Sequence, residues 1–256
     1  MFRDEDLRVA VNKLDLELGG LRRYPKPRMG SIGKLSSPVV AARSAANPIT
    51  CRPAVFADSG RIARLICVAG GGLYEFLLGD LIPFVHPANF LTIATASAGY
   101  AISYRNCLVA IDATLDAVIG MANVFPTDLL KQESLVMLPF NRRNHIRALV
   151  ELHDWGSMFV NALAVSELYR RRGIGGQLLD WAEDRAKQEG FDRLSLHVWA
   201  DNTTALNFYK ARGFIQLAVG NVPYHSRLRH VGGSILMQKK IGSASHCLLT
   251  DWRPIA

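Results

Sequence analysis

Apolar and polar residues alternate with two different periods along this chain, and these periods separate predicted strands from predicted helices. A period of two, or a short apolar run between turn residues, predicts a strand, whereas apolar residues three and four positions apart predict a helix. The predicted strands are 50–56, 106–111, 117–125, 158–165, 193–199, 213–219 and 234–238, and the predicted helices are 59–70, 73–81, 87–98, 173–188 and 202–211, with a partly helical stretch at 127–154. Strands and helices that alternate between flanking hairpins predict an α/β fold built on one mixed sheet.

The first fifty residues lack this periodicity. After a helix-like stretch at 6–18, Ser, Gly, Ala and Pro dominate as far as residue 48, a composition that predicts a mobile extension over residues 1–50. We therefore expect one α/β domain over residues 51–241 and a C-terminal tail over residues 242–256. The pair Gly33-Lys34 does not form a phosphate-binding loop, because Arg28 and Leu35 stand where that motif needs Gly and Ser or Thr.

Composition narrows the class of protein. With 49% hydrophobic and 20% charged residues the chain is typical of globular proteins. Its net charge of +8 suits an anionic ligand or partner, but the basic residues are spread along the chain, so nucleic-acid binding through the basic N-terminal arm stays a minor alternative. A homodimer is compatible with the sequence.

The apolar runs and the cysteines indicate the compartment. No apolar run approaches the length that spans a bilayer, and residues 1–11 are too acidic and interrupted for a secretory signal. We therefore expect a cytoplasmic protein with no membrane partner. Its four cysteines form no Cys-x-x-Cys pair and are expected to be reduced and mostly buried; they are Cys51, Cys67, Cys107 and Cys247.

A basic, glycine-rich turn joins the strand at 158–165 to the helix that begins at 173. Residues 170–176 read Arg-Arg-Arg-Gly-Ile-Gly-Gly. The first amides of a helix have no partners within it, glycines allow a ligand to approach the backbone, and the helix dipole favours an anion. The turn therefore predicts a pyrophosphate site. A dinucleotide fingerprint would need Gly where Leu178 stands, and an ATP-binding loop would need Lys followed by Ser or Thr.

A second motif follows the strand at 193–199. Residues 202–214 read Asn-Thr-Thr-Ala-Leu-Asn-Phe-Tyr-Lys-Ala-Arg-Gly-Phe, with Ala205, Phe208 and Tyr209 on one helix face and Gly213 at its end. The turn Arg-x-x-Gly-x-Gly and the segment Asn-x-x-Ala-x-x-Phe-Tyr-x-x-x-Gly-Phe together resemble the two signatures of the GNAT acetyltransferase superfamily. The resemblance covers residues 52–240, is specific over 158–214, and in the C-terminal half is most similar to the ribosomal-protein N-terminal alanine acetyltransferase type.

The resemblance implies a GNAT-like acyl-CoA N-acyltransferase fold with a splayed central strand pair. It also implies an N-acetyltransferase that uses acetyl-CoA as co-substrate and a primary amine as the attacking group. The acceptor stays open between a peptide N-terminus, a lysine, a polyamine, an amino acid and an aminoglycoside. The alternative is a non-catalytic acyl-CoA-binding sensor on the same fold. No cysteine lies in either motif, so an acyl-cysteine route is not expected, and no metal is expected either.

The resemblance also implies roles for single residues on the donor side. The pantetheine arm would pair with the backbones of Leu163 and Val165, and Asn202 would hydrogen-bond it. Tyr209 would protonate the leaving thiolate. The pyrophosphate would lie on Arg170, Arg171, Arg172, Gly173, Ile174, Gly175 and Gly176. Without a ligand, these motifs would be an ordinary strand–helix turn and a core helix.

The acceptor side is less strongly indicated. An alkyl ammonium of pKa ~10.4 is only about one part in a thousand neutral at pH 7.4, so a base must remove a proton before attack. Phe159 stands where some family members carry a Glu, and the candidate bases are therefore His197 and Glu75. Residues expected to line the acceptor or to orient a water are Asn161, Asn123 and Tyr224, the last in a loop that also contains His225 and His230. Each of these side chains could instead serve the fold alone.

Overall fold

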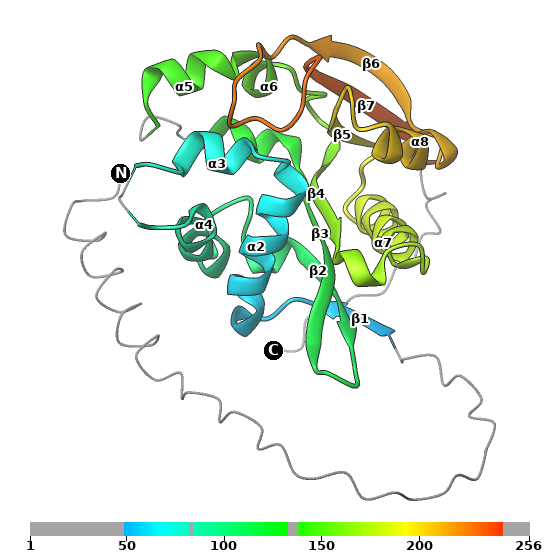
Figure 1. The fold of residues 1–256 in the computed structure, drawn as a ribbon. Helices are drawn as coiled ribbons and strands as arrows, with labels where there is room; N and C mark the ends of the chain where they lie inside the picture. Colours follow the sequence, from blue (N-terminus) through cyan, green and yellow to red (C-terminus); the bar gives the residue numbers. More distant parts are fainter. Residues whose placement is uncertain (1–48, 82–83, 133–137, 243–256) are drawn as a thin grey trace, which may run out of the picture. The chain divides into compact units, whose positions relative to one another are not determined.

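The computed structural model describes residues 49–81, 84–132 and 138–242 (Figure 1). The predicted extension over 1–50, except for its last two residues, lies outside this part, and so do the predicted helix at 6–18, the pair Gly33-Lys34, Cys247 and all but the first residue of the predicted tail over 242–256. In the described part no helix is both long and apolar enough to cross a membrane.

The described residues form one seven-stranded mixed sheet. Its strand order is β1-β2-β3-β4-β5-β7-β6, and every neighbouring pair is antiparallel except β4 and β5, which are parallel. The prediction of an α/β fold with a mixed sheet is confirmed. The strands are β1 (Ile49–Pro53), β2 (Cys107–Asp112), β3 (Ala117–Pro126), β4 (Met158–Val165), β5 (Arg193–Trp199), β6 (Ile215–Gly220) and β7 (Ser234–Lys240).

The helices match the predicted segments, with differences at their ends. Ser97 is extended and ends α4 earlier than expected, and Gly213, with φ of 86°, delays the start of β6. The α-helices are α2 (Ser59–Gly70), α3 (Leu73–Leu78), α4 (Pro87–Ala96), α5 (Phe140–His145), α6 (Arg147–Glu151), α7 (Ile174–Gln188) and α8 (Thr203–Ala211). Short 3-10 segments are η1 (Phe56–Asp58), η2 (Tyr104–Asn106), η3 (Thr127–Gln132) and η4 (Glu167–Tyr169).

Helices cover both faces of the sheet, as Figure 1 shows for α2 and α4 on one side and α7 on the other. Leu178 and Leu179 of α7 pack on one set of alternate strand residues, and Ile62 and Ile66 of α2 pack on the other set. Every residue of β2 is therefore buried. Such burial on both faces explains why this strand is a continuous apolar run in the sequence.

The three described cysteines are free thiols. Cys67 and Cys107 are buried, and Cys51 is exposed. Burial raises the pKa of the Cys67 and Cys107 thiols to about 12. Both buried thiols therefore stay protonated near neutral pH and act as apolar packing groups.

Candidate active site

The two parallel strands in the middle of the sheet pair only at their first residues. Met158 lies opposite Leu194 and Phe159 opposite Ser195, but β4 continues to Val165 and β5 to Trp199. Beyond Phe159 the facing edges of β4 and β5 therefore have no strand partner. Backbone groups left unpaired in this way can hydrogen-bond an extended ligand, and the predicted splayed strand pair is present.

A β-bulge marks the place where β4 leaves β5. The register between β3 and β4 moves from Asn123 opposite Ala162 to Val124 opposite Val160, so Asn161 is the extra residue. Such a bulge bends the strand that carries it. The positions predicted to pair with the pantetheine arm, Leu163 and Val165, follow the bulge on the splayed part of β4, and both are partly buried.

The turn after β4 directs free amides outward at the start of α7. Gly173 is the N-cap with φ of 81°, a conformation that favours glycine. The first α7 amide to reach a backbone carbonyl is that of Gln177, which bonds Gly173 O at 3.2 Å. The amides of residues 171–176 have no acceptor in the described part of the chain. A Cβ on Gly175 would lie 3.7 Å from Leu163 Cδ2 and 3.8 Å from Phe208 Cζ, so this glycine faces both β4 and α8.

The three arginines of this turn are exposed and form no ion pair with a described carboxylate. Arg170 Nε donates to Val165 O at 3.4 Å, and the Arg172 guanidinium lies 5.2 Å from the centre of the Tyr169 ring. Tyr169 in turn donates its hydroxyl to Asp112 Oδ2 at 2.7 Å, which ties the turn to the end of β2. Free amides and unpaired guanidinium groups at a helix start form an anion site.

Asn202 is the N-cap of α8. Its Oδ1 accepts a hydrogen bond from Ala205 N at 3.1 Å, and its side-chain nitrogen has no partner among the described residues. The cap accounts for asparagine at this position without any ligand. It also leaves the amide N–H groups available to a ligand, so the predicted contact with the pantetheine arm stays a prediction.

The ring of Tyr209 is enclosed by aromatic neighbours. It is 8% exposed and lies 5.2 Å from the Phe208 ring and 5.5 Å from the Phe214 ring, between centroids. Desolvation raises the pKa of Tyr209 to about 12. No described residue hydrogen-bonds the hydroxyl, and this oxygen is not among the polar atoms sealed from solvent. The hydroxyl is thus a protonated donor free to meet a ligand.

His197 has both ring nitrogens occupied by the protein. Nε2 lies 2.7 Å from Leu152 O and must donate to it, and Nδ1 lies 3.0 Å from Ser234 Oγ. Burial, with a smaller effect of nearby His153, lowers the pKa of His197 to about 4. A ring held between two partners with so low a pKa is poorly suited to deprotonate an ammonium group. These contacts favour a structural role over the predicted base role.

Glu75 lies in the first turn of α3, and this helix begins directly after two glycines with positive φ. Its Oε2 is buried and has no hydrogen-bond partner in the described part of the chain. Its charge also contributes, after desolvation, to the raised pKa of Cys67. A buried carboxylate oxygen without a partner destabilises a fold unless a cation or donor satisfies it. Of the two predicted bases, Glu75 is the one with an atom that no described residue hydrogen-bonds, and this atom is closed to solvent.

The two asparagines predicted near the acceptor differ in their surroundings. Asn123 is fully buried and donates to Ala101 O and Asn106 O, both at 3.3 Å. Its Oδ1 accepts from Asn161 Nδ2 at 2.9 Å. Asn123 is therefore satisfied as a structural group that holds the bulge, whereas Asn161 is partly exposed and its Oδ1 has no described partner.

The loop between β6 and β7 lies over the turn between α2 and α3. Arg229 N approaches Gly71 O at 3.4 Å, and the His230 ring stacks on Trp199 with 5.5 Å between centroids. His230 Nδ1 also bonds Asp201 Oδ1 at 2.7 Å. Tyr224 of the same loop is 74% exposed. The loop thus covers the two glycines that precede α3, and its predicted role in lining the acceptor stays a prediction.

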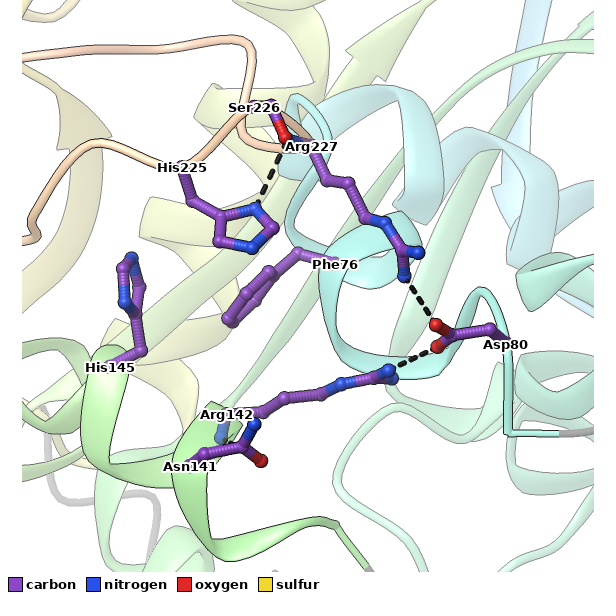
Figure 2. Close-up of a pocket in the computed structure, with 8 residues that line it drawn as sticks. All are labelled: Phe76, Asp80, Asn141, Arg142, His145, His225, Ser226 and Arg227. Carbon is purple, nitrogen blue, oxygen red and sulfur yellow. Dashed lines mark hydrogen bonds and ion pairs between the residues drawn. The ribbon is translucent and has the colours of Figure 1, made fainter.

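Beside this loop lies a cavity of about 470 Å³ (Figure 2). It is lined by Phe76, Asp80, Asn141, Arg142, His145, His225, Ser226 and Arg227. Sequence reasoning missed Asp80 and Arg142, because they lie 62 residues apart and in no motif. Within the described residues no group of three or more His, Cys, Asp or Glu side chains is placed to hold a metal ion.

Comparison with known families and proteins places these features in context. The family model described as Acetyltransferase (GNAT) family matches residues 98–214, which contain β3, β4, α7, β5 and α8. An uncharacterized N-acetyltransferase, YdgE of Bacillus subtilis, is 33% identical over 63 residues, which are 25% of this chain and 40% of that protein. N-alpha-acetyltransferase 30 of Saccharomyces cerevisiae is 36% identical over 59 residues, which are 23% of this chain and 34% of that protein.

The solved structures agree on the fold. The crystal structure of an N-acetyltransferase from Staphylococcus aureus Mu50 has a TM-score of 0.57 and 21% identity, over 74% of this chain and 99% of that one. The chain spans about a third to two-fifths of the length of the two curated relatives that it matches. The predicted resemblance to the GNAT superfamily is confirmed.

Proposed function

We propose that this chain, whose residues 98–214 match the family model described as Acetyltransferase (GNAT) family, moves an acetyl group from acetyl-CoA to a primary amine. We assign the activity to residues 51–241. The observation that carries the proposal is a combination of two features. A gap opens between β4 and β5. At its end lie a row of amides without an acceptor and three arginines without a carboxylate partner among the described residues. An extended ligand with a pyrophosphate group at one end matches both features.

The donor occupies this gap in our proposal. Its pyrophosphate accepts hydrogen bonds from the amides of residues 171–176, and the positive end of the α7 dipole favours its charge. The guanidinium groups of Arg170, Arg171 and Arg172 neutralise it further. The pantetheine arm lies along the backbones of Leu163 and Val165, and Asn202 donates its side-chain N–H to the arm.

The proposed reaction is a direct attack. The neutral amine nitrogen attacks the thioester carbonyl carbon, a tetrahedral intermediate forms, and the carbon–sulfur bond breaks with its electron pair on sulfur. The leaving thiolate takes the Tyr209 proton, the nitrogen of the new amide gives up one proton, and that proton restores the Tyr209 hydroxyl. The products are an amide and coenzyme A. A hydroxyl whose pKa is near 12 stays protonated at neutral pH, as a proton donor must.

The acceptor ammonium needs a group that binds it and takes its proton. We assign this to Glu75, because its buried Oε2 is without a partner in the described part of the chain. An ammonium group on this oxygen would satisfy the carboxylate, and the proton could then pass to Glu75 or to a water bound to it. Asn161, the extra residue of the bulge, offers its Oδ1 as a second acceptor for the amine in our proposal.

Two measurements on the whole chain test the proposal. Acetyl-CoA that binds the native state alone raises the free energy of unfolding by about 2.7 kcal/mol at a hundredfold excess over Kd, so the melting temperature should rise. Release of free thiol from acetyl-CoA, with a panel of amines, then reports turnover. A melting temperature that acetyl-CoA leaves unchanged would refute the proposed donor site. Stabilisation without thiol release for any amine would favour the acyl-CoA sensor.

A further inference from the structure

The cavity beside the loop between β6 and β7 has an unusual charge arrangement. Asp80 lies between two arginines: Arg227 Nη1 donates to its Oδ2 at 2.8 Å, and Arg142 Nη2 donates to its Oδ1. Figure 2 shows both guanidinium groups converging on this carboxylate. Two guanidinium groups and one carboxylate leave one net positive charge in the cavity.

Several N–H donors of these arginines have no partner among the described residues. Besides Asp80, Arg142 bonds only Leu77 O, at 2.9 Å, and Arg227 has no further side-chain bond among the described residues. Each guanidinium group has five N–H donors. The Arg142 side chain is 15% exposed and that of Arg227 46% exposed. An anionic ligand could therefore accept hydrogen bonds from several guanidinium N–H groups that have no acceptor among the described residues.

The opposite wall is aromatic and also presents a donor. The Phe76 ring lies 5.0 Å from the His145 ring and 4.6 Å from the His225 ring, between centroids. His225 Nδ1 accepts a hydrogen bond from Arg227 N at 3.1 Å, so in the neutral ring the proton is on Nε2. The cavity therefore combines a flat apolar surface with donors, and its volume of about 470 Å³ suits a small organic molecule.

The cavity adjoins the short helix α3, which contributes Phe76 to its lining and also carries Glu75, the proposed base. Phe76 directly follows Glu75 on α3. It also belongs to one buried cluster with Trp199, the last residue of β5, and with Leu228 of the covering loop. A ligand in the cavity thus lies against the same short helix that carries Glu75.

We propose that this cavity binds the carboxylate of the acceptor, so that the substrate is a small amine that also carries a carboxylate, as an amino acid does. The proposal rests on the proposed acetyl transfer. Arg142 and Arg227 bind the carboxylate, Phe76 contacts the apolar part of the molecule, and Glu75 receives the ammonium group. A peptide N-terminus has no free carboxylate next to its amine, and a polyamine has none at all, so both are poorer substrates.

Pairs of acceptors that differ only in this charge test the proposal. Amino acids and the corresponding amino acid amides are compared in thiol-release assays on the whole chain, with Arg227→Gln as the variant. The matched control is Arg147→Gln, an exposed arginine on α6 that faces Glu151 and does not line the cavity. Arg227 is preferred to Arg142 as the target because it makes no bond to the α3 backbone.

The wild type should prefer the free amino acids. A hydrogen bond to a charged group corresponds to roughly a tenfold to hundredfold change in binding. Arg227→Gln should therefore raise KM for the amino acid by roughly that factor, and leave both kcat and the KM of the amide nearly unchanged. Arg147→Gln should change neither KM. Equal KM values of the wild type for acid and amide, or an equal effect of Arg227→Gln on both, would overturn the proposal.

A calorimetric titration separates failure of this inference from failure of the proposed function. Free amino acids and inorganic phosphate are titrated into the wild type and into Arg227→Gln without acetyl-CoA. Amino acid binding that Arg227→Gln weakens supports the cavity even if no amine is acetylated. Tighter binding of phosphate than of every amino acid, or amino acid binding that Arg227→Gln leaves unchanged, would overturn the carboxylate assignment.

Discussion

Lowering the pH should destabilise the fold through His197. The pKa of this histidine is about 4 in the folded chain and about 6.5 when the chain is unfolded. Because the folded value is the lower one, the contribution to stability is fully present above pH 6.5 and is lost as the pH falls toward 4. His153, whose pKa burial also lowers, acts in the same direction.

The size of the effect follows from the shift. One pKa unit corresponds to about 1.36 kcal/mol, so a shift from 6.5 to about 4 corresponds to about 3 kcal/mol. The ring keeps some contact with solvent, and screening reduces this to roughly 2 kcal/mol. Urea unfolding of the wild type and of His197→Gln between pH 4 and 7.5 measures this contribution to the free energy of unfolding. Gln keeps an N–H group near Nε2 for Leu152 O and removes the titration.

The variant should be less stable than the wild type at pH 7, and its stability should fall less steeply between pH 6.5 and 4. Its kcat should stay within a few-fold of the wild type at temperatures where it is folded, because both ring nitrogens of His197 are already held by Leu152 O and Ser234 Oγ. If the free energy of unfolding falls equally steeply with pH in the two proteins, His197 does not cause the loss of stability at low pH. A loss of kcat by a hundredfold or more in a folded variant would restore His197 as the base.

Three substitutions test the other assigned roles. Gly175→Val should fold, because a Cβ at this position makes only ordinary van der Waals contacts, but it should weaken coenzyme A binding in a calorimetric titration. The control Gly99→Val, at a position with open space around it, should leave coenzyme A binding unchanged. Unchanged affinity in Gly175→Val would place the pyrophosphate elsewhere. Tyr209→Phe keeps the ring and should lower kcat by roughly tenfold to a hundredfold with acetyl-CoA affinity unchanged, and wild-type kcat would show that water protonates the thiolate. Glu75→Gln should lower kcat by roughly a hundredfold or more and should not destabilise the fold in urea, because the buried charge is removed; full activity would exclude Glu75 as the base.

The sequence predicted the parts of the fold that depend on local signals. The strand at 158–165 and the one at 193–199 have the bounds of β4 and β5, because the first is apolar at every position but Asn161 and the second begins with alternating polar and apolar residues. Helix α7 begins after Gly173, whose positive φ only glycine adopts readily. These signals lie within a few residues of the feature that they predict.

The site beyond the two motifs depends on contacts between distant segments. The partners of His197 come from residues 37 and 45 positions away along the chain, so no local pattern could separate a base from a structural histidine. The bulge at Asn161 arises from the register between β3 and β4. The charge arrangement of the cavity joins three separate elements, and only the folded chain brings Asp80, Arg142 and Arg227 together.

Acetyl transfer is tested most directly by a single incubation of the whole chain with acetyl-CoA and a panel of amines, in which free thiol and the mass of each amine are measured. We expect release of coenzyme A that depends on the amine, together with a product that carries one added acetyl group, fastest for amines that also have a carboxylate. Release of thiol at the rate of spontaneous hydrolysis, with no acetylated amine in the panel, would contradict the proposed acetyl transfer.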